Sequence, residues 1–256
     1  MGAGVKLTVI GCSGSFPGPD SPASCYLVES DAGEGTTRIL LDLGSGALGT
    51  LQSFVDPLAI DAVFITHLHA DHFFDMSGYY VMRRYHPDGP QPRIPAYGPN
   101  GTAERLARSY GLPLDPGMHE EFDFGVYDGE PTRIGPFTVD VARVVHPVEA
   151  WALRVTDGTG VLVYSGDTGP CGPLVELAKD ADLLLAEASF REGGDYPEEL
   201  HMTGREAGQA AADAGARMLV LTHIPPWYDK ELAREEARPV FDGPIEIART
   251  GATYDI

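Results

Sequence analysis

The sequence predicts an α/β fold, and three observations support this prediction. Short apolar runs rich in β-branched and aromatic residues, typical of buried strands, alternate with segments that we assign to helices. Several of these runs end abruptly in histidine or aspartate, and α/β sheets place their sites at the carboxyl ends of their strands. The 256 residues, 43% of them hydrophobic, suit one large α/β domain or two small ones. Because no linker or low-complexity block interrupts the chain, we expect a single domain over 1–256.

The expected elements follow one another in a regular order. We expect strands at 6–12, 25–29, 38–43, 62–66, 93–98, 137–145, 151–156, 160–164, 181–189, 218–222 and 245–249. We expect helices at 46–54, 75–85, 101–110, 203–214 and 229–238. From 112 to 136 the chain is acidic and irregular, and we expect no regular element there.

The loop that follows the first expected strand, 11–19, is too rich in glycine and proline for regular structure. It also lacks the lysine and the spacing of a phosphate-binding P-loop. One interpretation is a tight connector. The other is that backbone N–H groups and side chains of this loop line a substrate pocket, with Ser13, Gly14 and Ser15 as the candidates.

The most distinctive stretch is a buried-strand pattern, 62–66, that runs directly into a histidine cluster. His67 and His69 lie on the same side of near-extended backbone, because side chains alternate with a period of two. Asp71 and His72 follow at the next turn and can face the same cavity. Imidazole and carboxylate together suit zinc and similar divalent ions, so this stretch predicts a metal site.

The helix expected at 75–85 carries two features with alternative interpretations. Its stripe of Met76, Tyr79, Tyr80 and Met82 favours core packing over a platform for base stacking. Arg83 and Arg84 close the helix, where cations stabilise the negative end of the helix dipole. The alternative is that these two arginines reach a substrate phosphate.

Later strand patterns also end in residues that can bind metals or move protons. His146 follows 137–145, Asp167 follows 160–164 within Ser-Gly-Asp-Thr-Gly, and His223 follows 218–222. Glu187 lies within the buried pattern 181–189, where a carboxylate is unfavourable without a partner. Beyond it, His201 precedes a capping-box pattern formed by Thr203 and Glu206.

Charge and composition limit the possible partners. The formal net charge of −20 disfavours binding to bulk nucleic acid and to anionic membranes. No long apolar segment follows a basic start, so we expect neither a signal peptide nor a transmembrane helix. Cys12, Cys25 and Cys171 make neither a disulfide framework nor a CxxC metal motif, which favours a reducing cytoplasm. For Cys171 we favour a small buried residue over one that reaches the site.

The motif His67-x-His69-x-Asp71-His72 resembles the signature of the metallo-β-lactamase superfamily, the two-metal hydrolases. The resemblance extends along nearly the whole chain. Within the superfamily the chain is similar to the branch that holds the tRNA 3′-processing endonuclease RNase Z and the atypical class II-like cyclic-nucleotide phosphodiesterases of actinobacteria. The resemblance implies a four-layer αβ/βα sandwich and, from the family alone, a homodimer.

The resemblance also implies a site for two divalent ions. His67, His69 and His146 would hold the first ion, Asp71, His72 and His223 the second, and Asp167 would bridge them. Asp42, after the expected strand 38–43, would accept the other N–H of a ligating histidine, unless it is only a strand-ending turn residue. Zinc fits this nitrogen and oxygen ligand set, and manganese or iron fits as well.

The phosphodiesterase branch carries a strand-end glutamate and an His-x-Thr/Ser sequence, which this chain matches at Glu187 and His201. This match implies a Glu–His pair beside the metals. We expect His201, oriented by Glu187, to protonate the leaving oxygen or to hold the phosphoryl oxygens, and Asp71 to share the role of base with its role as a ligand. The alternative is a capping histidine and a satisfied core glutamate.

We therefore expect hydrolysis of small nucleotide phosphodiesters, such as 3′,5′-cyclic AMP or a 2′,3′-cyclic monophosphate. One alternative is an RNA 3′-end endonuclease, although nothing here resembles the Gly/Pro-rich, basic arm with which RNase Z enzymes usually grip tRNA. The other alternative is a hydrolase of carboxylic esters, lactones or thioesters.

Overall fold

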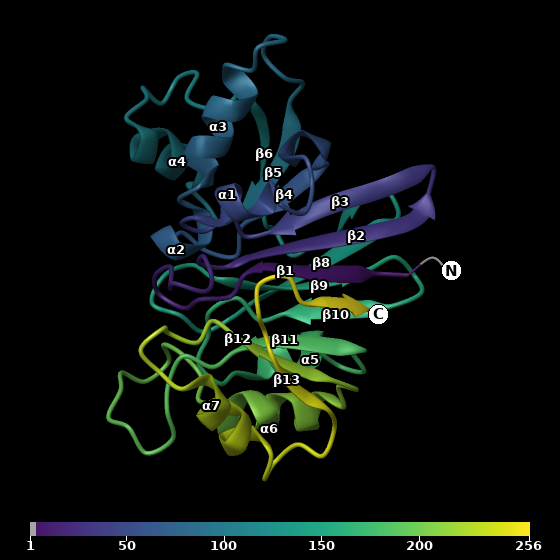
Figure 1. Ribbon diagram of the computed structural model, residues 1–256, viewed down its shortest axis with the longest axis vertical. Coiled ribbons are helices and arrows are strands. Elements are labelled where there is room, and N and C mark those ends of the chain that lie inside the picture. Colours follow the sequence, from purple (N-terminus) through teal and green to yellow (C-terminus); the bar gives the residue numbers. More distant parts are fainter. Residues whose placement is uncertain (1–3) are drawn as a thin grey trace.

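The computed structural model describes residues 4–256, which form two seven-stranded sheets with helices on their outer sides (Figure 1). The first sheet has the order β14-β1-β2-β3-β4-β5-β6 and the second has the order β13-β12-β11-β10-β9-β8-β7. Each sheet has three antiparallel and three parallel strand pairs. In the orders given, the antiparallel pairs come first in the first sheet and last in the second. The architecture is the αβ/βα sandwich that the resemblance implies.

The strands of the first sheet are β1 (Lys6–Gly11), β2 (Cys25–Gly33), β3 (Gly35–Leu41), β4 (Ala62–Phe64), β5 (Ile94–Gly98), β6 (Phe122–Val126) and β14 (Thr253–Asp255). Those of the second sheet are β7 (Thr132–Ile134), β8 (Phe137–Arg143), β9 (Trp151–Thr156), β10 (Val161–Tyr164), β11 (Leu183–Glu187), β12 (Leu219–Thr222) and β13 (Ile245–Ile247). The helices are α1 (Ala47–Leu51), the 3-10 turn η1 (Pro57–Ala59), α2 (Ala70–Phe73), α3 (Met76–Arg84), α4 (Thr102–Tyr110), α5 (Gly172–Leu177), α6 (Gly204–Ala214) and α7 (Lys230–Ala237).

Three apolar clusters hold these layers together. The central cluster lies between the sheets and takes side chains from both, among them Val28, Phe64, Val155 and Leu185. A second cluster packs α1 and α3 against the outer face of the first sheet, and a third packs α5, α6 and α7 against the outer face of the second. In Figure 1 the helices accordingly lie at opposite ends of the stacked sheets. Burial of these apolar faces is the dominant favourable contribution to folding.

The prediction of no regular element at 112–136 was wrong. Strand β6 pairs in parallel with β5, and β7 pairs with β8 through a tight turn. The alternation in β6 is interrupted by Gly125, where a Cβ atom would lie 2.4 Å from the ring of Tyr97. The neighbouring acidic residues and this glycine hide an edge strand from a pattern analysis.

Other differences concern short elements. The structure adds α2, α5 and β14, which the sequence pattern did not indicate, and α1 is shorter than the helix expected at 46–54. The stripe on α3 packs into the core, which is the interpretation that the sequence favoured. Met76, Tyr79 and Tyr80 are buried, and Met82 is partly buried. Among the described residues, no helix has both the length and the apolar character needed to cross a bilayer.

Candidate metal centre

The candidate site lies where segments that follow the carboxyl ends of strands from both sheets meet. The segment after β4 carries His67, His69, Asp71 and His72, and α2 places the last two on one short helix. His146, Asp167 and His223 follow β8, β10 and β12 of the facing sheet. The structure therefore brings together all seven residues that the sequence assigned to the metals.

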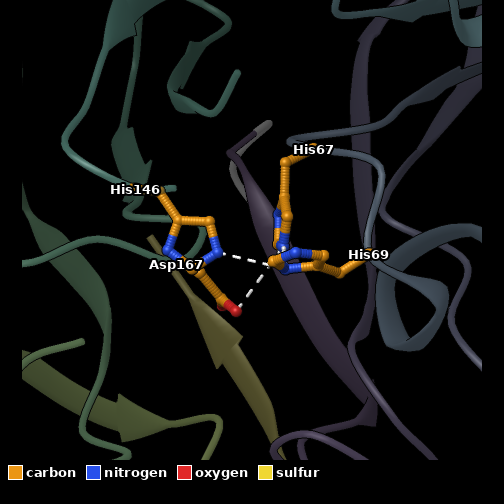
Figure 2. A group of neighbouring side chains, drawn as sticks. All are labelled: His67, His69, His146 and Asp167. Atoms are coloured by element: carbon orange, nitrogen blue, oxygen red, sulfur yellow. Dashed lines mark hydrogen bonds and ion pairs between the residues drawn. The ribbon is translucent and has the colours of Figure 1, made fainter. Parts of the chain in front are cut away.

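The first group of ligand-type atoms consists of His67, His69, His146 and Asp167, whose side chains converge (Figure 2). His67 Nε2 lies 3.0 Å from His69 Nδ1, and His146 Nε2 lies 3.1 Å from the same atom. Asp167 Oδ2 is 3.6 Å from His67 Nε2. One atom from each residue lies within 4.8 Å of all the others, which is the crowding expected of a coordination sphere.

The second group consists of Asp71, His72, Asp167 and His223. His223 Nε2 lies 3.1 Å from both Asp71 Oδ2 and His72 Nε2. Asp167 Oδ1 lies 3.2 Å from His72 Nε2 and 3.5 Å from His223 Nε2. Asp167 thus turns one carboxylate oxygen toward each group.

Two observations test whether this site fits a divalent cation. Within the part of the chain that the structure describes, Asp167 Oδ1 is buried without a hydrogen-bond partner, and a buried carboxylate is unfavourable unless a cation compensates it. Burial lowers the pKa of His67, His69 and His146, which favours the neutral imidazole that binds metals. Burial also opposes the charged form of His72, but the neighbouring carboxylates, Asp167 first, outweigh it and raise the pKa of His72. The donor set and its burial fit divalent metal binding.

His72 is held by a buried network on the side away from the metals. Its Nδ1–H donates to Asp42 Oδ2 at 2.7 Å, as expected of a carboxylate that orients a ligand. Asp42 also accepts from the Thr66 backbone N–H at 2.7 Å and from the Tyr164 hydroxyl at 2.9 Å. Burial and the Asp42 carboxylate raise the pKa of Tyr164 well above its ordinary value, so the phenol remains a donor.

Two further histidines also have their second nitrogen engaged. His146 Nδ1 donates to the backbone oxygen of Leu200 at 2.9 Å, and His223 Nδ1 lies 2.8 Å from the Ser189 hydroxyl. These contacts fix the rings and leave each Nε2 facing the site. Sequence reasoning missed Thr66, Tyr164 and Ser189. All three lie next to motifs in the sequence, but no local pattern shows which ligand each one supports.

Glu187 and His201 form a close pair at the edge of the metal groups. His201 Nδ1 lies 2.8 Å from Glu187 Oε1, and 4.0 Å from Asp167 Oδ2. The Glu187 carboxylate is fully buried and accepts the backbone N–H groups of Thr168 at 2.9 Å and Ser189 at 3.1 Å. Burial lowers the pKa of His201, but the facing Glu187 outweighs it and raises the pKa to about 9.

The alternative of a capping histidine does not describe the start of α6. Thr203 is the N-cap residue, and its hydroxyl accepts the Glu206 N–H at 3.2 Å while Glu206 reaches back to the Thr203 N–H at 2.8 Å. This capping box leaves His201 outside the helix, directed toward Glu187 and the metal groups.

The loop after β1 lies against His223. The Ser15 N–H is 3.4 Å from His223 Nε2, and Ser15 is exposed. A Cβ atom on Gly14 would lie 2.1 Å from the His223 backbone oxygen, so only glycine allows this approach. Ser13 is buried and forms bridges to Ala23 and Ile224. Of the three loop candidates, Ser15 is the one left accessible beside the site.

The two arginines of α3 and the cysteines at positions 12 and 171 contact residues outside the metal groups. Arg83 is buried and donates to Tyr79 and to the Pro92 backbone oxygen, while Arg84 pairs with Glu120 and Glu121. Cys171, half-buried at the start of α5, lies 3.5 Å from the Thr168 hydroxyl. Cys12 is buried and donates to the Ala248 backbone oxygen.

Comparisons with known proteins agree with this geometry. A family model described as beta-lactamase superfamily domain matches residues 37–224. The uncharacterized protein ML1173 of Mycobacterium leprae is 48% identical over 98% of this chain and 89% of its own length. The probable metallo-hydrolase YhfI of Bacillus subtilis is 33% identical over 98% of this chain and 100% of its own.

Two more comparisons concern a solved structure and an RNA-processing enzyme. The crystal structure of YhfI superposes with a TM-score of 0.87 at 31% identity and covers 99% of this chain and 100% of that one. A ribonuclease Z of Myxococcus xanthus is 31% identical over 98% of both chains.

Proposed function

Because the chain belongs to the metallo-β-lactamase superfamily and is a metal-dependent hydrolase, we propose that it is a two-metal phosphodiesterase that acts on small nucleotides, such as 3′,5′-cyclic AMP. The observation that carries this proposal is the Glu187–His201 pair, 2.8 Å apart, at the edge of the metal groups. Hydrolysis of an alkyl phosphodiester expels a poor leaving group, an alkoxide, which departs more readily when an acid protonates it.

The seven converging side chains are enough for two ions. One ion would be held by His67, His69 and His146, and the other by Asp71, His72 and His223. Asp167 would bind both ions. Zinc fits these nitrogen and oxygen donors best. When bound, a pair of divalent ions makes water more acidic and neutralises charge that develops on phosphoryl oxygens.

The chain's own residues orient the proton that the leaving group needs. Glu187 engages His201 Nδ1, so Nε2 is free to donate to a departing ribose oxygen. Two backbone N–H groups hold the Glu187 carboxylate in place, and it stabilises the imidazolium form. Asp71, close to His223, shares the role of base on the entering side.

The test is a parallel assay of 3′,5′-cyclic AMP, 2′,3′-cyclic nucleotides and precursor tRNA, with metal content measured on the same sample. We expect turnover of a cyclic nucleotide and about two metal ions per chain. Bound metal with turnover of lactones or thioesters alone would overturn the proposal, as would cleavage of precursor tRNA alone.

An RNA 3′-end endonuclease is the second candidate, because the ribonuclease Z of Myxococcus xanthus is 31% identical over 98% of the chain. The net charge of −20 weighs against it, since RNA affinity depends largely on contacts between cations and phosphates. This candidate predicts RNA binding that weakens steeply with salt, whereas binding of a cyclic nucleotide would depend on salt only weakly.

A further inference from the structure

Two large aromatic rings are exposed beside the metal centre. Phe16 is 38% exposed and Trp227 is 63% exposed, and their ring centroids lie 4.8 Å apart with an angle of 45° between the planes. Neighbouring aromatic side chains that stay exposed form an apolar patch, and such patches often mark sites for a ligand or partner. We name Phe16 and Trp227 the ring pair.

Both rings extend from segments that contact the metal centre. Phe16 directly follows Ser15, whose N–H lies 3.4 Å from His223 Nε2, and Trp227 is four residues after His223. The two segments are joined, because the Gly14 N–H donates to the Ile224 backbone oxygen at 3.3 Å. In Figure 1 the loops after β1 and β12 lie at the same edge of the molecule as α2.

The backbone that carries the ring pair is restrained. Ser15 and His223 both have positive φ angles, 63° and 55°, and non-glycine residues in this region cluster at functional sites. Proline follows Phe16, and Pro225-Pro226 precedes Trp227, so φ is fixed on both sides. Backbone restrained in this way loses little conformational entropy when a ligand binds to the rings.

We propose that the ring pair is a stacking platform for the base of the nucleotide whose phosphodiester reacts at the metal centre; this inference rests on the function proposed above. Stacking on an aromatic face needs no positive charge, so it can hold a nucleobase on a chain with a net charge of −20. Every base has a π face, so the platform selects nucleotides over other phosphodiesters and discriminates weakly among bases.

Other aromatic groups are less suited to this role. Tyr79 and Tyr80 on α3 are buried in the core. Phe190 and Tyr196, near His201, stack on each other at 4.1 Å with an angle of 7°, so each already covers a face of its partner. The planes of the ring pair, in contrast, are splayed at 45°.

The first experiment compares a cyclic nucleotide with the cyclic phosphate of methyl riboside, which has the same reacting group and no base. The preference is the ratio of kcat/KM for the nucleotide to kcat/KM for the compound without a base. Trp227→Ala should lower this ratio by about 5- to 150-fold, the range found when a stacking ring is removed. The change should come mainly from a higher KM for the nucleotide. Trp227→Phe should retain most of that preference. Tyr85→Ala is the matched control, since Tyr85 is 65% exposed at the far end of α3 and should leave the preference unchanged.

The second experiment needs no turnover. The chain has two tryptophans, Trp151 and Trp227, so Trp227→Phe removes one known source of fluorescence. Adenosine monophosphate should quench the emission of the metal-loaded protein to saturation, ribose 5-phosphate should not, and the quenching should be lost in Trp227→Phe.

The outcomes separate this inference from the proposed function. Turnover of cyclic nucleotide with an unchanged preference and unchanged quenching in the Trp227 variants would overturn the stacking platform and leave the function standing. If no phosphodiester is hydrolysed, the proposed function is wrong, and the platform is then tested only by fluorescence. Quenching that needs both the base and Trp227 would support the platform, and its absence would refute it. A fall in particle mass in Trp227→Ala, with unchanged nucleotide affinity, would make the ring pair a contact between copies and overturn the inference.

Discussion

At the residue scale, His201 differs from the ligating histidines in its partner. A buried carboxylate engages its Nδ1, and its ring lies next to the metal groups without joining either of the two groups built on Asp167. A histidine placed in this way suits the proton transfer that we propose, and the seven residues of the two groups on Asp167 would hold the metals.

We therefore expect His201→Ala to retain its metals and to lose turnover of a cyclic nucleotide by about 10²- to 10⁴-fold, the usual contribution of a general acid. Metal analysis and steady-state kinetics on the same preparation would measure both effects. His119→Ala is the control, since its ring packs on Phe124 away from the metal centre. Loss of metal in His201→Ala would instead make His201 a ligand.

A second prediction concerns the network behind His72. Tyr164→Phe deletes one hydroxyl that donates to Asp42 at 2.9 Å and keeps the buried ring that packs on Tyr26 at 4.8 Å. Partners of this kind typically contribute about 10- to 100-fold to metal affinity, so affinity should fall by about tenfold while the fold is kept. Competition with a chelator would measure the change, and an unaltered affinity would show that Thr66 alone orients Asp42.

At the element scale, the loop after β1 and the segment after β12 are in backbone contact at Gly14. Gly14→Ala places a Cβ atom 2.1 Å from the His223 oxygen, so the loop or His223 must move. We expect turnover to fall by more than about tenfold, since small displacements of catalytic groups have large effects. Gly49→Ala is the matched control, because it lies in α1 with nothing within 4 Å and should slightly stabilise the protein. Equal activity of both variants would contradict a role for the loop.

The strands show how much of the fold could be predicted from the sequence. The strands that carry the site were predicted because each is an apolar run closed by a ligand-type residue, as with Phe64 before His67 and Tyr164 before Asp167. The missed strands β6 and β7 lie at sheet edges, where burial is incomplete and the alternating pattern is weak.

The sequence predicted the ligand-type residues of the site but not all of the residues that support them. Four ligand-type residues form one compact motif, and the resemblance implied the role of Asp42. The hydroxyl of Tyr164, which supports His72 through Asp42, comes from a distant part of the chain and was missed. The ring pair joins Phe16 to Trp227 in the same way. Contacts of this kind depend on how the two sheets face each other, and no local pattern encodes that arrangement.

At the scale of the whole molecule, the metal centre joins the two sheets. The segment after β4 of the first sheet supplies four of the seven ligand-type residues, and the segments after β8, β10 and β12 of the second supply three. Elsewhere the sheets are joined by apolar packing in the central cluster. Bound ions should therefore stabilise the contact between the sheets as well as serve the reaction.

Removal of the metals should lower the midpoint of thermal unfolding. A ligand present at about a hundred times its Kd stabilises the folded state by about 2.7 kcal/mol. In a chain of this size that corresponds to a shift of roughly 5–10 °C. The expected loss on chelation has a second source, because the Asp167 carboxylate is left buried without its cation.

Differential scanning calorimetry before and after chelation would measure this shift, and adding zinc back should restore the midpoint. Asp167→Ala should not retain metal, because it removes an oxygen from both groups, so chelation should leave its midpoint unchanged. Asp213→Ala, an exposed aspartate on α6, should respond as the unaltered protein does. If chelation strips the metals from the unaltered protein and its midpoint stays the same, apolar packing alone holds the sheets together, and the ions act only in catalysis.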